Sequence, residues 1–355
     1  MRLDAVLAGI VSFVVAILLV WTKDLHGKFS MDSTYGVQKS HTAPTPRIGG
    51  VAIAFGVLVG YAASSQDPAA AEKRAILASI ILAGIPAFVF GLLEDLTKNV
   101  SVRARLLATM ASGLLGWGVT GVSITHVDIP GLDWLLGFTF ISVLFTAFAV
   151  GGVANSINII DGFNGLAAGS VLIMLAAFGV IARTVGDIPL AFSCLVIAGA
   201  ILGFFLVNWP FGKIFLGDGG AYFVGFALAW IAVLLPHRNS SVTPWVSLLV
   251  CIHPVIEVAS SYIRRSVRVN QHPSEPDRLH MHHLIHARIV RHLFPGVNRL
   301  SHNWLTSPLC WICVGLPAFA AVLTYRNSTW VFAAIFVYTF GYAVAYRRLT
   351  RFKWF

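Results

Sequence analysis

The sequence predicts an all-α polytopic membrane protein with about eleven transmembrane helices (ten or eleven). Hydrophobic residues make up 57% of the 355 residues and charged residues 11%, and the mean hydropathy is +0.79, whereas about a quarter of the residues of a soluble domain are charged. A spanning helix needs about 20 mainly apolar residues, and the apolar segments are too long and uniform for the strands of an outer-membrane barrel. The expected spans are residues 3–21, 48–65, 76–93, 104–121, 136–153, 165–183, 189–207, 219–236, 244–262, 307–324 and 329–346.

The distribution of basic residues predicts the orientation of these spans. If the N-terminus lies outside, 19 of the 25 Lys and Arg residues fall in segments on the inner side. The other six are Arg2, Lys73, Arg74, Arg183, Arg238 and Arg326. The positive-inside rule therefore predicts a periplasmic N-terminus and a cytoplasmic C-terminus. Every polar segment discussed below then lies on the cytoplasmic face.

We expect a single integral membrane domain over residues 1–355, with one long cytoplasmic basic loop at 263–306. Alternation of Val127, Ile129 and Leu132 around a Pro-Gly pair predicts a small periplasmic β-hairpin near 122–135. The formal net charge of +10 gathers on the cytoplasmic surface and suits anionic lipid headgroups and phosphorylated substrates. Nucleic acid is the poorer partner, because these charges are spread over loops and form no basic soluble domain.

A glycine-rich turn around Asp218 precedes the span 219–236. Glycines allow the backbone to approach a ligand closely, and the start of a helix favours negative charge. A phosphate there would be repelled by Asp218 unless a hard cation lay between them. Mg²⁺ is commonly held by one or two carboxylates together with substrate phosphates. The alternative is that Asp218 only caps the helix.

Two adjacent carboxylates, Glu94 and Asp95, end the span 76–93. Adjacent acids at a low-dielectric boundary repel each other, so one of them tends to have a raised pKa or to bind a cation. A general base or a metal partner is one interpretation of the pair. The other is two solvated acids that pair with Lys98, Arg103 or Arg105.

Asn155, Asn158 and Asp161 recur every three residues and so share one face of a helix. Polar groups at the end of a span are costly unless they are satisfied by each other, by water or by a ligand. Glycines on either side of Asn164 mark the turn into the next helix. This stripe is the strongest local sign of a binding surface.

Histidines and arginines are concentrated between Asp277 and His292. One interpretation is a basic amphipathic helix that lies on the membrane. The other is a clamp in which His and Arg side chains bind phosphate. A zinc site is less well supported, because no cysteine or carboxylate cluster completes it.

These segments, in this order and between spans, resemble the polyprenyl-phosphate N-acetylhexosamine-1-phosphate transferase family (glycosyltransferase family 4). The resemblance covers about residues 32–295 and is most specific at 41–50, 155–169, 215–225 and 276–283. The pattern Pro-Asp-Arg-x-His-x-His-His is similar to that of the N-acetylglucosamine-type branch. Glu94 departs from the family, which usually has two aspartates at this pair, and Asn164 stands where many members have Asp.

The resemblance implies roles for individual residues. Glu94, Asp95 and Asp218 would be catalytic, and Asp218 would also bind Mg²⁺, with Mn²⁺ as the alternative ion. Phe215 would stack near the uracil. The residues implied in substrate binding are Lys39, Asn155, Asn158, Asp161, Asn164, Phe215, Arg278, His280, His282 and His283.

The implied reaction transfers a sugar 1-phosphate of N-acetylhexosamine type from a UDP-sugar to undecaprenyl phosphate. It releases UMP and starts a lipid-linked cell-envelope glycan, such as lipopolysaccharide O-antigen, at the cytoplasmic face of the bacterial inner membrane. The lipid phosphate attacks directly after deprotonation by Asp95, or an acidic residue forms a covalent intermediate; the sequence leaves both open. The oligomeric state is also open, with a homodimer as one option.

Two other classes of membrane protein remain to be weighed. A transporter of an anionic or nucleotide-linked substrate would place ionisable groups near the bilayer midplane, where the charged candidate is Glu257, four residues after His253 and within reach of it. A CDP-alcohol phosphotransferase would need several aspartates and an Arg after Asp161-Gly162. Neither class accounts for polar segments gathered at one membrane face as well as the transferase does.

Overall fold

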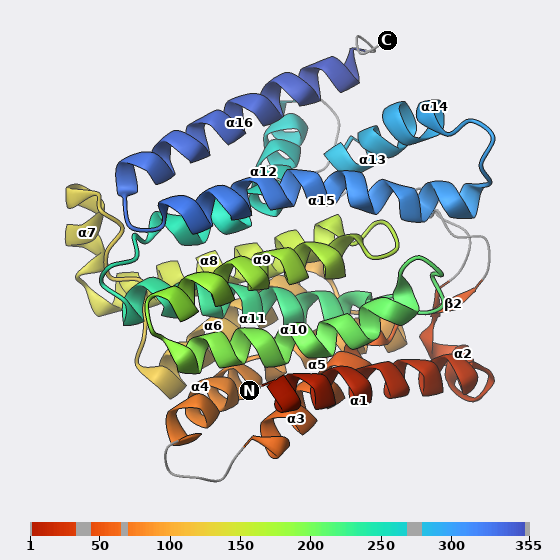
Figure 1. Ribbon diagram of the computed structural model, residues 1–355, viewed down its shortest axis with the longest axis horizontal. Coiled ribbons are helices and arrows are strands. Elements are labelled where there is room, and N and C mark those ends of the chain that lie inside the picture. Colours follow the sequence, from red (N-terminus) through yellow and green to blue (C-terminus); the bar gives the residue numbers. More distant parts are fainter. Residues whose placement is uncertain (1, 33–43, 65–69, 268–278, 352–355) are drawn as a thin grey trace.

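The protein is a bundle of long helices that run along its longest axis (Figure 1). The computed structural model describes residues 2–32, 44–64, 70–267 and 279–351. The first half of the chain forms α1 (Arg2–Trp21), α2 (Lys23–Ser30), α3 (Gly49–Ala63), α4 (Ala71–Ala83), α5 (Ile85–Thr97), α6 (Val102–Thr120), α7 (Pro130–Leu136) and α8 (Thr139–Ile160). The second half forms α9 (Leu166–Thr184), α10 (Ile188–Asn208), α11 (Gly217–Arg238), α12 (Trp245–Val267), α13 (Met281–Ile285), a π-helical turn (His286–Val290), α14 (Arg291–Leu293), α15 (Arg299–Thr324) and α16 (Ser328–Thr350).

Each of the expected spans coincides with a helix or a pair of helices. Within the described ranges, eight helices are long and apolar enough to cross a membrane, or nine if the bent pair α4–α5 is one span. This pair bends by 41° because Gly84 ends α4 and Pro86 stands in the first turn of α5. The all-α membrane fold is therefore confirmed, while the number of spans and their orientation stay predictions.

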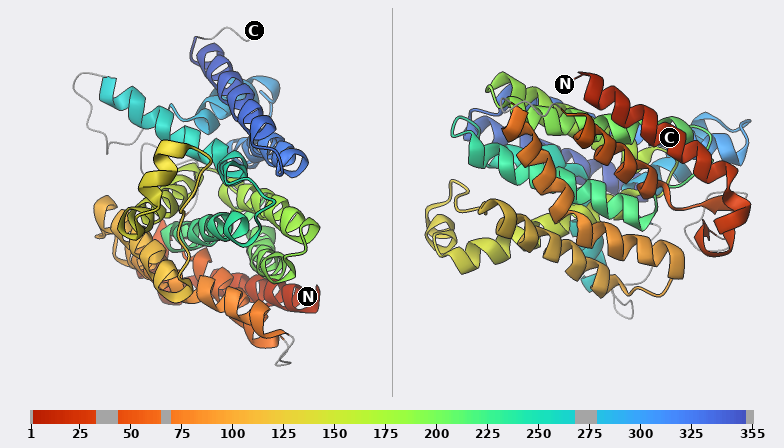
Figure 2. Two further views of the ribbon diagram at one scale, coloured as in Figure 1. Left: turned by 90° about the vertical axis from the view of Figure 1, so that its left-hand side faces the viewer. Right: turned by 90° about the horizontal axis from the view of Figure 1, so that it is seen from below.

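Helix α11 is the central element of the bundle. Every residue from Gly217 to Leu235 is buried, and the end-on view shows the other helices around it (left panel of Figure 2). Helices α3, α5, α6, α8 and α9 all contact it. The start of α11, where Asp218 lies, is thus held by the packing of the whole bundle.

The expected periplasmic β-hairpin near 122–135 is wrong. The chain there is extended without strand pairing and then forms α7. Pro130 stands in the first turn of α7, where its missing N–H costs nothing. In the described chain, strands β1 (Met31–Asp32) and β2 (Thr45–Pro46) form one antiparallel pair, with Met31 opposite Pro46.

The expected loop at 263–306 is largely helical where it is described. Helix α12 continues to Val267 and α15 already begins at Arg299. Residues 279–293, which we call the histidine segment, contain α13, the π-helical turn and α14. Met281, Leu284, Ile285 and Val290 of this segment are buried in a small apolar cluster with Phe163 and Leu166. The segment therefore packs on the protein. It is not a helix that only rests on lipid headgroups, which was one interpretation of the sequence.

Candidate active site

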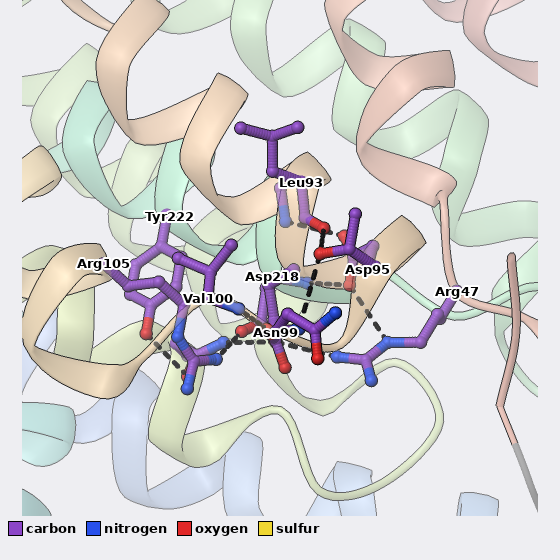
Figure 3. Close-up of polar contacts among 12 residues, drawn as sticks. Arg47, Leu93, Asp95, Asn99, Val100, Arg105, Asp218 and Tyr222 are labelled. Atoms are coloured by element: carbon purple, nitrogen blue, oxygen red, sulfur yellow. Dashed lines mark hydrogen bonds and ion pairs between the residues drawn. The ribbon is translucent and has the colours of Figure 1, made fainter. Parts of the chain in front are cut away.

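Asp218 lies where the C-terminal end of α5 meets the N-terminal end of α11 (Figure 3). Gly217 before it has a φ of 73°, and a Cβ at that position would overlap the Arg47 carbonyl oxygen. A Cβ on Gly91 of α5 would lie 2.6 Å from the Asp218 backbone. The glycines here serve close packing of backbone on backbone, and they hold the Asp218 carboxylate at the end of the bundle.

Two arginines bind the Asp218 carboxylate from opposite sides (Figure 3). Arg47 lies 3.0 Å from Oδ1, and Arg105 of α6 contacts Oδ2. Asn158 of α8 also donates to Oδ1 at 3.2 Å, and Tyr222 donates to the Asn158 amide oxygen at 3.3 Å. Side chains from three other parts of the chain thus surround one carboxylate, and two positive charges stand beside it.

Asp95 is buried and binds the start of α11 with both carboxylate oxygens. Oδ1 accepts the backbone N–H of Asp218 at 2.9 Å, and Oδ2 accepts that of Gly219 at 2.8 Å. The Arg47 Nε is 3.0 Å from Oδ1. These N–H groups have no partner within their own helix, so Asp95 acts as a capping group supplied by another helix.

Glu94 points elsewhere, although it is the next residue of the same helix. Its carboxylate accepts the backbone N–H of Val100 at 2.8 Å and so closes the turn between α5 and α6. Successive residues on a helix point about 100° apart, which accounts for the separation. Among the described residues, neither Glu94 nor Asp95 forms an ion pair with Lys98 or Arg103, although the sequence allowed one. Arg105, the third candidate, binds Asp218 instead.

Part of the polar stripe of α8 (Asn155, Asn158 and Asp161) faces Asp218. Asn158 contacts Asp218, and Asp161 follows the last turn of α8 as its C-terminal cap. Desolvation raises the pKa of Asp161 to about 7; the Asp218 charge adds to the rise and Arg47 opposes it. Asn155 is half-buried one turn earlier. The stripe therefore leads from Asp218 towards the turn between α8 and α9.

Asn164 connects that turn to the rest of the protein. Its N–H donates to Asn303 at 2.8 Å, and its carbonyl accepts the hydroxyl of Ser307 at 2.6 Å. The side chain is buried and contacts the Pro210 carbonyl at 3.4 Å. These contacts give Asn164 a structural position beside the stripe. Phe215 is half-buried and connects β2 to α3 through its backbone, with 2.8 Å to Pro46 and 2.9 Å to Gly49.

The histidine segment lies against the turn between α8 and α9. The rings of His282 and His283 are 5.9 and 5.5 Å from that of Phe163, and a Cβ on Gly162 would be 3.1 Å from His282 Nε2. The ring of His280 is parallel to that of His282, 5.4 Å away. Burial lowers the pKa of His282 well below its usual range, and the neighbouring histidines add to the effect. At neutral pH, His282 is therefore a neutral donor or acceptor.

Lys39 and Arg278 lie outside the described residues. Three residues that the sequence analysis did not choose stand at the centre of the site: Arg47, Arg105 and Tyr222. Arg47 does belong to a segment on which the resemblance is most specific, and that was the available signal. The sequence offered Arg105 only as a partner of Glu94 and Asp95, and Tyr222 carries no local signal because it lies within a span.

The Asp218 carboxylate is the group of this site that could hold a magnesium ion together with substrate phosphates. Within the described ranges, no three His, Cys, Asp or Glu residues form a metal cluster. In this structure both Asp218 oxygens are bound by arginines, and Asn158 turns its NH₂ group to Asp218 and its amide oxygen to Tyr222. Mg²⁺ is often held by one or two carboxylates, with phosphates and water completing its shell.

The chain matches known proteins over most of its length. The model of glycosyl transferase family 4 matches residues 77–236, which include both acids of α5, the α8 stripe and Asp218. A probable undecaprenyl-phosphate N-acetylglucosaminyl 1-phosphate transferase of Bacillus subtilis (strain 168) is 29% identical over 293 residues, 80% of this chain and 78% of that protein.

Two further relatives show the breadth of the similarity. A phospho-N-acetylmuramoyl-pentapeptide-transferase of Clostridium perfringens (strain 13 / Type A) is 31% identical over 264 residues, 72% of this chain and 81% of that protein. A decaprenyl-phosphate N-acetylglucosaminephosphotransferase of Mycobacterium leprae (strain TN) is 29% identical over 313 residues, 80% of this chain and 74% of that protein.

Proposed function

Because the chain belongs to glycosyl transferase family 4, whose members named above are phosphotransferases, we propose that it moves N-acetylglucosamine 1-phosphate from its UDP conjugate to undecaprenyl phosphate. UMP is the other product. The names of two relatives combine a polyprenyl phosphate with N-acetylglucosamine, and the name of the third gives phospho-N-acetylmuramoyl-pentapeptide. The histidine pattern of residues 276–283 is the reason to choose N-acetylglucosamine over the muramoyl-pentapeptide substrate.

The observation that carries this proposal is the pair of arginines on Asp218. A donor diphosphate and an acceptor phosphate are both anions and repel each other. Arg47 and Arg105 offer two guanidinium groups that match phosphate oxygens in geometry, and they converge on one carboxylate at one end of the bundle. A transporter would need its ionisable groups near the midplane of the bilayer. None of the three relatives named above has a name that describes a transporter.

The reaction exchanges one phosphorus–oxygen bond for another. An oxygen of the lipid phosphate attacks the phosphorus that carries the sugar, and the bond from this phosphorus to the bridging oxygen breaks, so UMP leaves with that oxygen. A phosphate monoester has a second pKa of about 6, so at neutral pH the acceptor is mostly a dianion. Direct attack therefore needs no strong base.

This chemistry favours a positioning role for Asp95 over the role of general base. Its carboxylate already accepts two backbone N–H groups and an arginine. To take a proton it would have to give up contacts that hold the start of α11. We propose that Asp95 orients Asp218 and Arg47, while the arginines stabilise the charge that develops on the phosphoryl oxygens.

Asp218 is the residue that we propose to hold Mg²⁺, with Mn²⁺ as the alternative ion. When bound, the ion would neutralise charge on the diphosphate. Asn155, Asn158 and Asp161 would line the donor pocket beside it. The site would face the cytoplasm at the inner membrane of a bacterium, where nucleotide sugars are available.

The test is release of UMP by the purified protein. The enzyme in detergent is incubated with undecaprenyl phosphate, Mg²⁺ and either UDP-N-acetylglucosamine or UDP-N-acetylmuramoyl-pentapeptide, and the lipid product is extracted. We expect UMP and a lipid-linked sugar with the first donor. Turnover only with the second donor would move the chain to the muramoyl branch, and no turnover with any UDP-sugar would refute the proposal.

A further inference from the structure

A fully buried carboxylate, Glu257, stands in the middle of α12 and accepts hydrogen bonds from three donors. Oε1 accepts the hydroxyl of Tyr342 at 2.9 Å, and Oε2 lies 3.1 Å from Nδ1 of His280. The backbone N–H of Met281 lies 3.1 Å from both oxygens. His253, which the sequence places within reach of Glu257, interacts with it electrostatically, while its Nδ1 contacts the hydroxyl of Tyr338 at 2.7 Å.

Glu257 therefore connects a membrane helix to the first residues of the histidine segment. Pro254 lies one turn before it in α12, and the C-terminal part of this helix projects from the bundle (Figure 2). A proline removes a hydrogen bond within its helix. Glu257, three residues further on, lies where α12, α16 and the histidine segment meet.

The contact also decides the state of the His280 ring. An ionised carboxylate only accepts hydrogen bonds, so Nδ1 of His280 carries a proton and points at Glu257. The ring plane is thereby set, and it lies within 6° of the plane of the His282 ring. His282 Nε2 in turn faces Gly162, next to Asp161, since a Cβ on that glycine would lie 3.1 Å from it. A series of neighbouring groups therefore runs from Glu257 to the end of the α8 stripe.

We propose that Glu257 is a positioning residue for this reaction: it orients the His280 and His282 rings beside Asp161. The inference rests on the proposed function, because the histidines matter for turnover only if substrate phosphates bind beside them. A carboxylate buried in a membrane helix costs free energy unless it is fully hydrogen-bonded. Its three donors meet that requirement, and two of the three belong to the histidine segment.

The experiment is a double-mutant cycle with kcat/KM as the readout. Glu257→Gln keeps the size of the side chain but turns one acceptor into an NH₂ group that faces other donors. As a single substitution, Glu257→Gln should lower kcat/KM about 10- to 100-fold, because it leaves a buried donor without an acceptor. In a His280→Ala background the same change should cost less than about threefold, since Glu257 acts through His280.

Two variants serve as matched controls. Tyr342→Phe removes one donor to Glu257 but leaves both contacts to the histidine segment, so kcat/KM should change by less than about threefold. His253→Gln alters a buried polar residue of the same helix that contacts Tyr338, and it should affect thermal stability more than kcat/KM. If Glu257→Gln costs the same with and without His280, Glu257 does not position that ring.

Hydrogen–deuterium exchange gives a readout that does not need activity. Glu257→Gln should speed exchange in the histidine segment, above all at Met281, and leave α11 unchanged. Unaltered exchange there would overturn the proposal even if the enzyme proved inactive with every donor. Inactivity of the wild type together with faster exchange in the variant would instead refute the proposed function and leave the positioning contact established.

Discussion

Asp218 shows how much one side chain depends on its neighbours. Its carboxylate receives Arg47, Arg105 and Asn158, which come from three different parts of the chain. A carboxylate in this setting stabilises both guanidinium groups, and it is the proposed ligand of Mg²⁺. Its charge is therefore expected to matter more than its size.

The first prediction is that Asp218→Asn abolishes most turnover without unfolding the protein. Asparagine keeps the shape and the hydrogen bond to Asn158, but it removes the charge that the arginines and the cation need. We expect kcat to fall at least about 10²- to 10³-fold, measured by UMP release, with a thermal midpoint within a few degrees of the wild type. A folded variant with near-normal kcat would exclude Asp218 as the metal ligand.

The second prediction separates the two acids of α5. Asp95→Asn puts an NH₂ group against the backbone N–H groups of Asp218 and Gly219, so both activity and stability should fall, activity by at least about 100-fold. Glu94→Gln keeps an oxygen that accepts from Val100, and Glu94→Asp keeps the charge, so each should retain activity within about tenfold. The measurements are kcat and the thermal midpoint of each variant. A larger loss of activity in Glu94→Gln than in Asp95→Asn would reverse the roles of the two acids.

At the scale of elements, the histidine segment is held from two sides. Met281 and His280 contact α12, while Phe163 and Gly162 bring the segment against the turn between α8 and α9. Its apolar residues are buried on the protein. The histidines are thus part of a packed element, and the ionisation of His282 is coupled to folding.

The third prediction follows from the lowered pKa of His282. The unfolded chain has an ordinary histidine pKa of about 6.5, whereas the folded state keeps this ring neutral, so below pH 6.5 the unfolded state binds more protons. His282 should therefore lower the free energy of unfolding progressively as the pH falls from 7 to 5. Melting curves over this range should show a weaker pH dependence in His282→Gln; equal slopes would contradict the prediction.

At the scale of the whole molecule, the two ends of the bundle differ. Arg47, Asp95, Asn158 and Asp218 meet at the end where α5 and α8 stop and α11 starts. At the other end, Arg238 binds Asp187 at 2.7 Å and Glu72 at 2.7 Å, which connects the last turn of α11 to the starts of α10 and α4. One end carries the candidate chemistry and the other an ion-pair network between helices.

The fourth prediction concerns the orientation of these ends. The excess of basic residues near the site predicts that it faces the cytoplasm, so we expect Ser240 to be periplasmic and Thr350 cytoplasmic. Single cysteines at these positions, in a chain whose own four cysteines are replaced, should react with an impermeant thiol reagent added to intact cells at position 240 only. Labelling at both positions would overturn the charge-based orientation.

The sequence by itself determined the helical membrane fold and which segments carry chemistry. Both are local properties: the length and apolarity of a segment decide whether it spans a membrane, and the short polar segments stand out against an apolar background. Boundaries of α3, α9, α10 and α16 followed from the same signal. The predicted β-hairpin failed because alternation over a few residues does not supply a pairing partner.

Only the tertiary structure decided which of these residues act on one another. Asp95 and Asp218 are 123 residues apart, and Arg47 and Asp218 are 171 apart. The two acids of α5 look equivalent in sequence, yet one caps α11 and the other closes a loop. Glu257 likewise takes its hydrogen-bond partners from distant segments and not from His253 one turn away. Packing of backbone on backbone at Gly91 and Gly217 brings these groups together, and such long-range contact leaves no mark in the local sequence.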